Sequence, residues 1–541
     1  MTNAQSKFSN PSFFLLLAAA LAGSVALIAA TSSWGIGACQ DSAMYLAGAR
    51  NILNGYGYRN YADMDPIIQW PPFFSFTLAL LGKLGPDPLL GARILHVILF
   101  GVSILMVGFV LKKFTRSSAI AFLGSFLMLT STANIRVHSM AWSEPWFLFL
   151  AFLGFFSLNE YLGTGKKFFF FASALLAGLA CLDRYAGVSV IAAGALILLL
   201  LHQKSISKRL TDAVSYTILS ALPLGLWLVR NYIVEQSLVN RDLGYHLPAS
   251  KYSEEALRTL SAWVLHDSFP HAWRHGAFAF AAAVVVVVSF VVIFREVKTH
   301  SPKILSRDNS LRLAASLAIF SVCNAALELA HLIFMNAHAN ANDRHFVPFF
   351  IAGVIGFLIL VDRLLQAYPK NYFLKSAVTV FFVCLAVSNL YSATHFLQEI
   401  YDKGSDHTSR QWKTSPTLAR AKTLADGNAL IYSNDPSIIY VLTNQRVFRL
   451  PRKYESRRHY VTQESTKKND RLAIQLGKIK KKLIDRDGYI VLLDERLRWF
   501  KLSEDDLKQH MPLVIVEKFS DGAIYQIQPT PNLETVKAKS L

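Results

Sequence analysis

The chain first shows a membrane-spanning pattern in residues 13–58, which read FFLLLAAALAGSVALIAATSSWGIGACQDSAMYLAGARNILNGYGY. The apolar part, which ends near residue 31, matches the roughly 20 residues that a helix needs to cross a membrane. The polar part, residues 39–58, carries a single acidic side chain, Asp41. This stretch therefore predicts a first span followed by a segment that holds one carboxylate near the membrane surface.

The whole composition agrees with a membrane protein. The 541 residues are 53% hydrophobic with a mean hydropathy of +0.33, which is too apolar for an ordinary soluble chain. Apolar windows of span length recur as far as Leu390 and then stop. We expect about eleven transmembrane helices, at residues 12–31, 89–111, 117–134, 146–162, 168–182, 186–202, 211–229, 277–294, 313–335, 346–361 and 376–394. The sequence thus predicts a polytopic α-helical transmembrane domain at 1–395, with an outer loop at 32–88, and a soluble C-terminal domain at 396–541.

Basic residues predict how the helices are oriented. Lysines and arginines fall in alternate loops, namely at Lys112, Lys113, Arg116, Lys166, Lys167, Lys204, Lys208, Arg209, Arg295, Lys298, Lys303, Arg363, Lys370 and Lys375. By the positive-inside rule these loops and the N-terminus are cytoplasmic, and an odd number of spans puts residues 396–541 outside. We expect a multi-pass protein of the plasma (inner) membrane. The net charge of +19 then needs no nucleic acid partner, because it reflects this bias and a basic C-terminal domain.

A signal peptide and a disulfide framework are two further possibilities that the sequence addresses. Residues 13–30 could be the core of a cleaved signal peptide, but the apolar run is longer than such cores usually are. Of the four cysteines, only Cys39 lies outside the expected spans, so no disulfide framework is predicted.

Charges that the positive-inside rule does not explain gather on the predicted outer side. They are Asp41 and Arg50 in DSAMYLAGAR, Asp63 and Asp65 in YADMDPIIQWPPF, Glu144 in SMAWSEPW, Asp183 and Arg184 in CLDRYAG, and Asp343, Arg344 and His345 in NDRHFVP. Charges at the ends of spans are costly unless they pair, reach water or face a polar cavity. Their shared side predicts a site at the outer membrane surface.

Asp41 has two interpretations. It opens a segment, residues 42–54, whose apolar residues follow a helical period and whose end is marked by Gly55, so Asp41 could be the N-cap of a helix. It could instead be a general base beside the membrane. Tyr45 follows four residues later, on the same face of such a helix.

The later charged residues also have structural alternatives. Ser143, Glu144 and Pro145 read as the start of a span, where an acid is favoured by the helix dipole, or Glu144 could serve the site as a second acid. Arg184 and Arg344 could be residues that reach from span ends to the membrane surface, or ligands of a phosphate, whose oxygens suit the planar guanidinium.

The order of these segments resembles the GT-C superfamily of polyprenyl-phosphate-dependent glycosyltransferases, in particular the branch of protein O-mannosyltransferases and the lipid A aminoarabinose transferase. The likeness rests on five segments, DSAMYLAGARNILNGYGY, WPPFFSFTLALLG, AWSEPWFLF, LACLDRYAGVSV and NDRHFVPFF, and covers roughly residues 10–395. A weaker likeness extends to IYSNDPSIIYVLTNQRVFRLP in the C-terminal domain.

The resemblance implies an inverting glycosyltransferase of the cell envelope that moves a hexosyl or pentosyl group from a polyprenyl-phosphate donor to a lipid, glycan or protein acceptor. By this resemblance Asp41 matches the catalytic base. Arg344, Arg184 and His345 are then the expected donor-phosphate ligands, and Glu144, Tyr45 and Arg50 would support the acceptor and the site. A transporter or flippase, or a non-catalytic binder of lipid-linked sugars, is the alternative, although no internal repeat supports transport.

No obligatory metal is expected, because Gln40 and Ser42 flank Asp41 where many relatives have a second acid. Asp63, Asp65 and Glu144 would be the oxygen donors if a divalent metal were bound.

The C-terminal domain mixes short β-branched runs with one long helical pattern. ALIYS, SIIYVLT, GYIVLLDE and PLVIVEKF predict strands, and residues around 466–484 predict a helix with a lysine-rich solvent face. These patterns predict a small α/β domain whose role the sequence leaves open.

Overall fold

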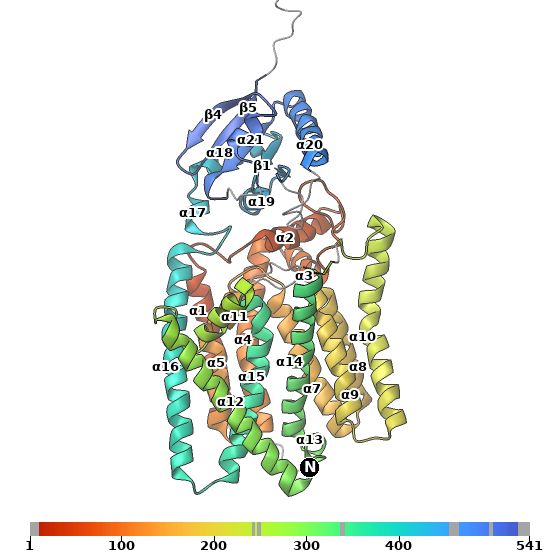
Figure 1. Ribbon diagram of the computed structural model, residues 1–541, viewed down its shortest axis with the longest axis vertical. Helices are drawn as coiled ribbons and strands as arrows, with labels where there is room; N and C mark the ends of the chain where they lie inside the picture. Colours follow the sequence, from red (N-terminus) through yellow and green to blue (C-terminus); the bar gives the residue numbers. More distant parts are fainter. Residues whose placement is uncertain are drawn as a thin grey trace, which may run out of the picture. The chain divides into compact units, whose positions relative to one another are not determined.

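A computed structural model describes residues 10–240, 244–245, 250–335, 341–453, 465–496 and 501–528. The chain forms two compact units (Figure 1). The helical unit contains Met1–Ile36 and Ile68–Asp402, and the sheet unit contains Gly37–Ile67 and Lys403–Leu541. The expected boundary at residue 395 falls inside a helix that ends at Lys403, and part of the expected outer loop belongs to the sheet unit.

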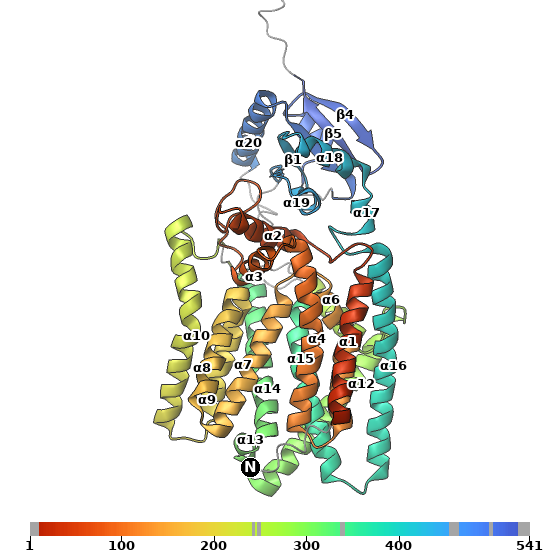
Figure 2. The ribbon, with the colours of Figure 1, turned by 180° about the vertical axis from the view of Figure 1, so that it is seen from behind.

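The helical unit is built from long helices that run side by side, with one, α12, inclined across the others (Figures 1 and 2). Its α-helices are α1 (Asn10–Ala30), α3 (Phe73–Gly82), α4 (Pro88–Phe114), α5 (Ser118–Thr130), α6 (Thr132–His138), α7 (Glu144–Thr164), α8 (Lys167–Asp183), α9 (Val188–Leu201), α10 (Ile206–Glu235), α11 (Ser250–Ala262), α12 (His271–His300), α13 (Ile304–Arg307), α14 (Asn309–Phe334), α15 (Asp343–Ala367) and α16 (Tyr372–Lys403).

Fewer helices have the length and apolar composition of a typical span than the eleven expected. Within the described residues, eight helices are long and apolar enough, or nine if the bent pair α5 and α6 counts as one span. The expected spans at 168–182 and 186–202 correspond to α8 and α9, of 17 and 14 residues. At 1.5 Å per residue these are about 26 and 21 Å long, short of the ~30 Å hydrocarbon core. Composition alone did not distinguish these short, well-packed helices from full spans.

The basic loops lie together at one end of the helical unit. Lys113 in the last turn of α4 pairs with Glu160 near the end of α7 at 2.7 Å. Gln203, after α9, donates to the Ser306 carbonyl at 2.7 Å. Arg312 of α14 donates to Asn159 of α7 at 2.9 Å. These contacts join the ends of α4, α7, α9 and α13 to the start of α14. The alternate loops that carry the basic residues therefore lie at the same end of the bundle.

The sheet unit contains a five-stranded mixed sheet in the order β2-β1-β3-β5-β4. The strands are β1 (Ile431–Ser433), β2 (Phe448–Arg449), β3 (Tyr489–Leu493), β4 (Leu513–Phe519) and β5 (Gly522–Ile527). β1 pairs in parallel with β2 and β3, whereas β5 pairs antiparallel with β3 and β4. The helices are α2 (Gln40–Leu53), α17 (Arg410–Lys413), α18 (Pro416–Asp426), α19 (Pro436–Thr443), α20 (Ser465–Asp485) and α21 (Glu504–Lys508).

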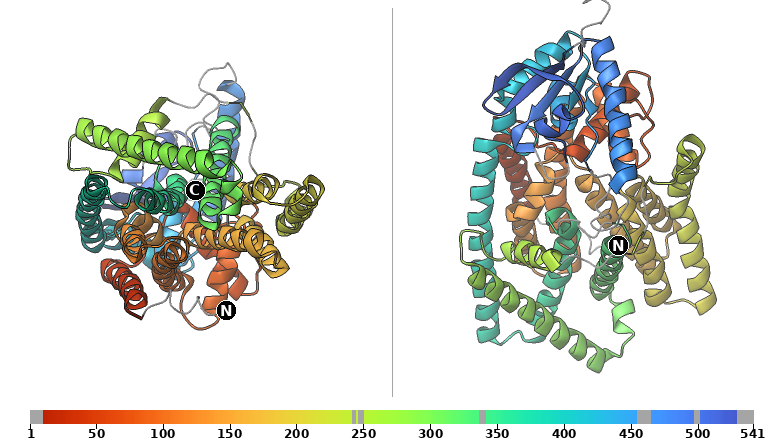
Figure 3. Two further views of the ribbon diagram at one scale, coloured as in Figure 1. Left: turned by 90° about the horizontal axis from the view of Figure 1, so that it is seen from below. Right: turned by 45° about the horizontal axis from the view of Figure 1, so that its top comes forward.

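Helices cover both faces of this sheet (Figure 3). Along β3, Ile490 and Leu492 pack with Leu476 and Leu483 of α20, while Val491 and Leu493 pack with residues of α18 and α19. Successive strand residues point to opposite faces, so a strand covered on both faces is apolar throughout. The expected small α/β domain is confirmed.

One strand prediction in this unit is wrong. SIIYVLT, residues 437–443, forms most of helix α19 although it is rich in β-branched and aromatic residues. Pro436 occupies the first helical turn and Asn444 ends the helix in the left-handed conformation with φ of 59°. These end signals and the burial of Ile438 and Ile439 outweigh the β propensity of the run.

Candidate active site

In the helical unit, Glu144 is the centre of a charged cluster. It is the first residue of α7, it follows Ser143 at the N-cap position, and its side chain is 2% exposed. Glu160, which pairs with Lys113, lies 16 residues further along α7, about 24 Å away. Glu144 therefore lies at the end of the bundle opposite the basic loops.

Two arginines from two other helices bind the same oxygen of Glu144. Arg344, in the first turn of α15, donates its Nε to Glu144 Oε1 at 2.5 Å and lies over the Trp142 ring at 4.3 Å. Arg184, which ends α8, pairs with the same Oε1 through Nη1 and reaches Ser143 Oγ at 3.4 Å. Each guanidinium has five N–H groups, so one carboxylate oxygen leaves several donors on each arginine for other acceptors.

The charged residues next to these arginines in the sequence, His345, Asp343 and Asp183, differ in their contacts. His345 binds Glu328 of α14 through Nδ1 at 3.0 Å. Asp343 pairs with Arg136 at 2.8 Å and accepts the Trp263 indole N–H at 3.1 Å. Asp183 is fully buried, and the described residues offer it no ion-pair partner within 4 Å. Arg184 thus pairs with Glu144 and not with its sequence neighbour.

The space beside this cluster is small. Glu144, Arg184, Glu328, Arg344 and His345 line a cavity of about 10 Å³ together with Asn324 and apolar residues. A cavity of this size holds about one water molecule. A phosphate bound here would require the arginine side chains to shift while they keep their contact with Glu144.

In the sheet unit, Asp41 lies in the first turn of α2 but is not its N-cap. Helix α2 begins at Gln40 with Cys39 at the N-cap position, and the Ser42 hydroxyl accepts the Cys39 backbone N–H at 3.0 Å. The capping interpretation of Asp41 is therefore wrong. The other end of α2 agrees with the sequence, since Gly55 follows the helix with φ of +80°, a conformation that favours glycine.

Asp41 is half-buried and lines a pocket of about 290 Å³ within the sheet unit. The other walls come from the C-terminal part of the chain and carry charges of both signs: Asp406, His407, Asp435, Arg449, Arg452, Arg496 and Lys501. These residues form no local sequence pattern, because they are scattered over nearly 100 positions. Only Arg449 lies in a segment, TNQRVFRLP, that stands out for its arginines.

The other candidate residues between positions 37 and 67, namely Tyr45, Arg50, Asp63 and Asp65, do not line the pocket that contains Asp41. Tyr45 is 3% exposed within α2, and Arg50 is 8% exposed with its guanidinium 5.3 Å from the centre of the Tyr440 ring. Asp63 and Asp65 are exposed. The described residues contain no group of three or more His, Cys, Asp and Glu placed to hold a metal ion.

Comparisons with known proteins identify the fold. No family model matches the chain, and no curated protein sequence matches it. ArnT from Cupriavidus metallidurans, in the apo state, is similar with a TM-score of 0.58 and 12% identity, over 96% of this chain and 100% of that chain.

Two further structures agree. The oligosaccharyltransferase AglB from Archaeoglobus fulgidus, solved with an inhibitory peptide and a dolichol-phosphate, has a TM-score of 0.51 and 11% identity over 96% of this chain and 75% of that one. The arabinofuranosyltransferase AftD from Mycobacteria has a TM-score of 0.53 and 12% identity over 95% of this chain and 41% of that one. These proteins are GT-C glycosyltransferases, so the resemblance drawn from the sequence is confirmed for the fold.

Proposed function

We propose that this chain is an inverting glycosyltransferase that moves a sugar from a polyprenyl-phosphate donor to a lipid, glycan or protein acceptor at the outer face of the membrane. The observation that carries the proposal is the pair of arginines on Glu144, one from α8 and one from α15, in a chain with a GT-C fold. The dolichol-phosphate in the similar oligosaccharyltransferase supports a lipid phosphate as the leaving group.

Arg344 and Arg184 are assigned to the donor phosphate. Their guanidinium groups offset the negative charge that grows on the phosphate as its bond to the sugar breaks. His345 assists as a hydrogen-bond donor, while Glu328 fixes the orientation of its ring. Glu144 holds both arginines, and this role fits its burial better than the contact with the acceptor that the resemblance implied.

Asp41 is assigned as the general base. It takes the proton from the acceptor hydroxyl while the acceptor oxygen bonds to the anomeric carbon and the bond from that carbon to the phosphate oxygen breaks. A single displacement inverts the sugar carbon. Tyr45 and Arg50 are assigned to packing within the sheet unit, because both are buried. No divalent metal is required in this scheme.

Transfer of a radiolabelled sugar tests the proposal. Purified full-length protein in nanodiscs would be given a panel of polyprenyl-phosphate sugars, with extracted outer-surface lipid and protein as acceptors. Asp41→Asn is expected to lower transfer by roughly 10²–10⁴-fold, the usual contribution of a general base. Because Cys39, and not Asp41, caps α2, this change leaves the cap of the helix intact.

Asp65→Asn is the matched control, since Asp65 is an exposed carboxylate in the same N-terminal segment of the sheet unit. It is expected to retain transfer within twofold. Equal activity of Asp41→Asn and wild type would remove Asp41 from the chemistry. Absence of transfer with every donor would favour a transporter, a flippase or a non-catalytic binder of lipid-linked sugars.

A further inference from the structure

The pocket that contains Asp41 is larger than the space that a general base requires for one acceptor hydroxyl. Its volume of about 290 Å³ is close to the lower end for small-molecule sites, and all its walls belong to the sheet unit. They are residues 39–41 at the start of α2, residues 406–407, Asn434, Asp435 and Ser437 around the start of α19, residues 449–452 at the end of β2 and beyond it, and residues 496 and 501–502.

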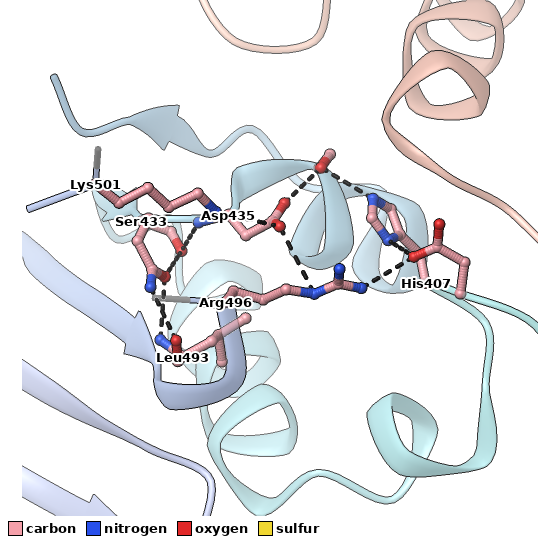
Figure 4. A network of polar contacts seen from close by, with 9 residues as sticks. His407, Ser433, Asp435, Leu493, Arg496 and Lys501 are labelled. Atoms are coloured by element: carbon pink, nitrogen blue, oxygen red, sulfur yellow. Dashed lines mark hydrogen bonds and ion pairs between the residues drawn. The ribbon is translucent and has the colours of Figure 1, made fainter. Parts of the chain in front are cut away.

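Permanent positive charges exceed carboxylates in this wall. Arg449, Arg452, Arg496 and Lys501 share this wall with three carboxylates, those of Asp41, Asp406 and Asp435. Asp406 binds His407 Nδ1 and Arg496 Nη2, each at 2.9 Å. Asp435 accepts the Ser437 hydroxyl at 2.6 Å and lies 3.5 Å from Lys501 Nζ (Figure 4).

Asp406 and Asp435 remain charged at neutral pH. Burial alone would raise the pKa of Asp406, but the hydrogen bonds and charges of His407 and Arg496 outweigh burial and lower it. Burial likewise acts to raise the pKa of Asp435, and Lys501, His407, Ser437 and Arg496 together lower it. Both carboxylates therefore act as fixed anchors that hold Arg496 and Lys501 in the wall of the pocket.

Arg496 keeps an unused donor in this arrangement. Its Nε is buried and has no hydrogen-bond partner among the described residues, and the nearest carboxylate oxygen, on Asp435, is 3.8 Å away. A buried N–H of a charged group is costly to leave without an acceptor. The guanidinium also lies 5.1 Å from the centre of the Trp412 ring, which limits its freedom.

The same contacts resemble a hydrolase relay, since His407 Nε2 lies 3.0 Å from Ser437 Oγ and Asp406 lies on the other ring nitrogen. However, the Ser437 hydroxyl donates to Asp435, and the Ser437 residue is 1% exposed. A nucleophile needs an accessible oxygen whose proton passes to histidine. We therefore regard this network as the support of the two cations.

We propose that the sheet-unit pocket binds an anionic group, a phosphate or a carboxylate, of the acceptor, through Arg449, Arg452, Arg496 and Lys501. The inference rests on the proposed function in taking Asp41 as the base for the acceptor. It adds a substrate class for the acceptor, namely an anionic molecule that also carries a hydroxyl. When the pocket walls hold the anion of such an acceptor, a nearby hydroxyl is presented to the Asp41 carboxylate in the same pocket. Paired arginines suit the oxygens of phosphate and carboxylate.

The first test measures binding without turnover. Full-length protein in nanodiscs of neutral lipid would be saturated with polyprenyl phosphate and then titrated with glycerol 3-phosphate or glycerate, with glycerol as the uncharged control. Binding would be followed by thermal stabilisation, which grows with ligand concentration over its Kd. The Arg449→Gln/Arg452→Gln double variant is expected to bind the anions at least tenfold more weakly than wild type. Both arginines are exposed, so the folded unit should tolerate the change.

Arg410→Gln is the matched control, because Arg410 is an exposed arginine of the same unit outside the pocket. It is expected to bind within twofold of wild type. Equal binding by the double variant and wild type would overturn the proposal, as would failure of wild type to bind either anion. Displacement of the bound anion by additional polyprenyl phosphate would assign the pocket to the donor and would also overturn it.

The second test separates this proposal from the proposed function. If the chain transfers sugar, the double variant is expected to raise the KM for an anionic acceptor at least tenfold while the KM for the donor stays within twofold. Anion binding with no transfer would retain the pocket and reject the enzyme. Transfer with an unchanged acceptor KM would retain the enzyme and reject the pocket.

Discussion

Glu144 illustrates how one buried residue can organise two others. Its carboxylate holds Arg184 and Arg344, whose side chains are 21% and 17% exposed. Glu144→Gln keeps the shape but removes the charge, so two partly buried guanidinium groups lose their counter-ion. Loss of one partner from a buried ion pair is strongly destabilising, and we expect a cost on the order of 2 kcal/mol here because both arginines still reach solvent. Thermal unfolding in detergent should therefore begin several degrees lower.

Glu160→Gln provides the comparison on the same helix. Glu160 pairs with Lys113, whose side chain is 53% exposed, and such pairs contribute about 0–1 kcal/mol. If the Glu160→Gln variant melted at as low a temperature as the Glu144→Gln variant, the destabilisation would come from loss of a charge on α7 in general and not from loss of the contact with the two arginines.

The candidate site could be predicted from the sequence only in part. Ser143, Glu144 and Pro145 gave the start of α7, and Arg184 and Arg344 were recognised as charges that the positive-inside rule does not explain. The capping pattern at Asp41 was misassigned by two positions, because cysteine at the N-cap gives a weak signal. The contacts with Glu328 and Arg496 depend on tertiary packing and leave no local pattern.

At the scale of elements, small residues explain how the short helices α8 and α9 are packed. A Cβ atom added at Gly178 of α8 would lie 2.9 Å from the Ser220 carbonyl oxygen and 3.0 Å from Pro223 Cγ, both on α10. Close approach of helices through glycine is typical of membrane proteins. Gly178→Ala is expected to destabilise the protein by about 1–3 kcal/mol, because the backbone of α10 must move. Thermal unfolding in detergent would measure it.

Gly225→Ala is the control, since Gly225 is an exposed glycine of α10 where an added Cβ meets nothing within 4 Å. It should be neutral or slightly stabilising, as alanine favours a helix by up to about 1 kcal/mol over glycine. Equal stability of the two variants would contradict the close packing of α8 on α10.

Apolar composition predicted each helix that is long and apolar enough to be a span, but could not give the number of spans. The runs at 168–182 and 186–202 are as apolar as true spans, yet α8 and α9 contain only 17 and 14 residues. Their ends are set by Arg184 at the close of α8 and by the 3₁₀ turn Tyr185–Gly187. Tertiary packing in a bundle, which a hydropathy window does not record, stabilises helices of this length.

For the whole molecule, the predicted sidedness requires an odd number of spans. Eleven spans and nine are both odd, and nine is the count in the described residues when α5 and α6 form one bent span. An odd number puts the N-terminus and residues 403–541 on opposite sides of the membrane. By the positive-inside rule we still predict that the basic loops lie at the cytoplasmic end of the helical unit.

Single cysteines in a background with all four native cysteines replaced by serine would test this sidedness. Lys422→Cys, at an exposed position of α18, is expected to react with a membrane-impermeant maleimide on intact cells. Lys166→Cys, in the exposed loop before α8, should react only after permeabilisation. Both replace exposed lysines, so neither should disturb folding. Labelling of both from the same side would require an even number of crossings between Lys166 and Lys422, whereas α10, α12, α14, α15 and α16 are five, and would overturn the predicted sidedness.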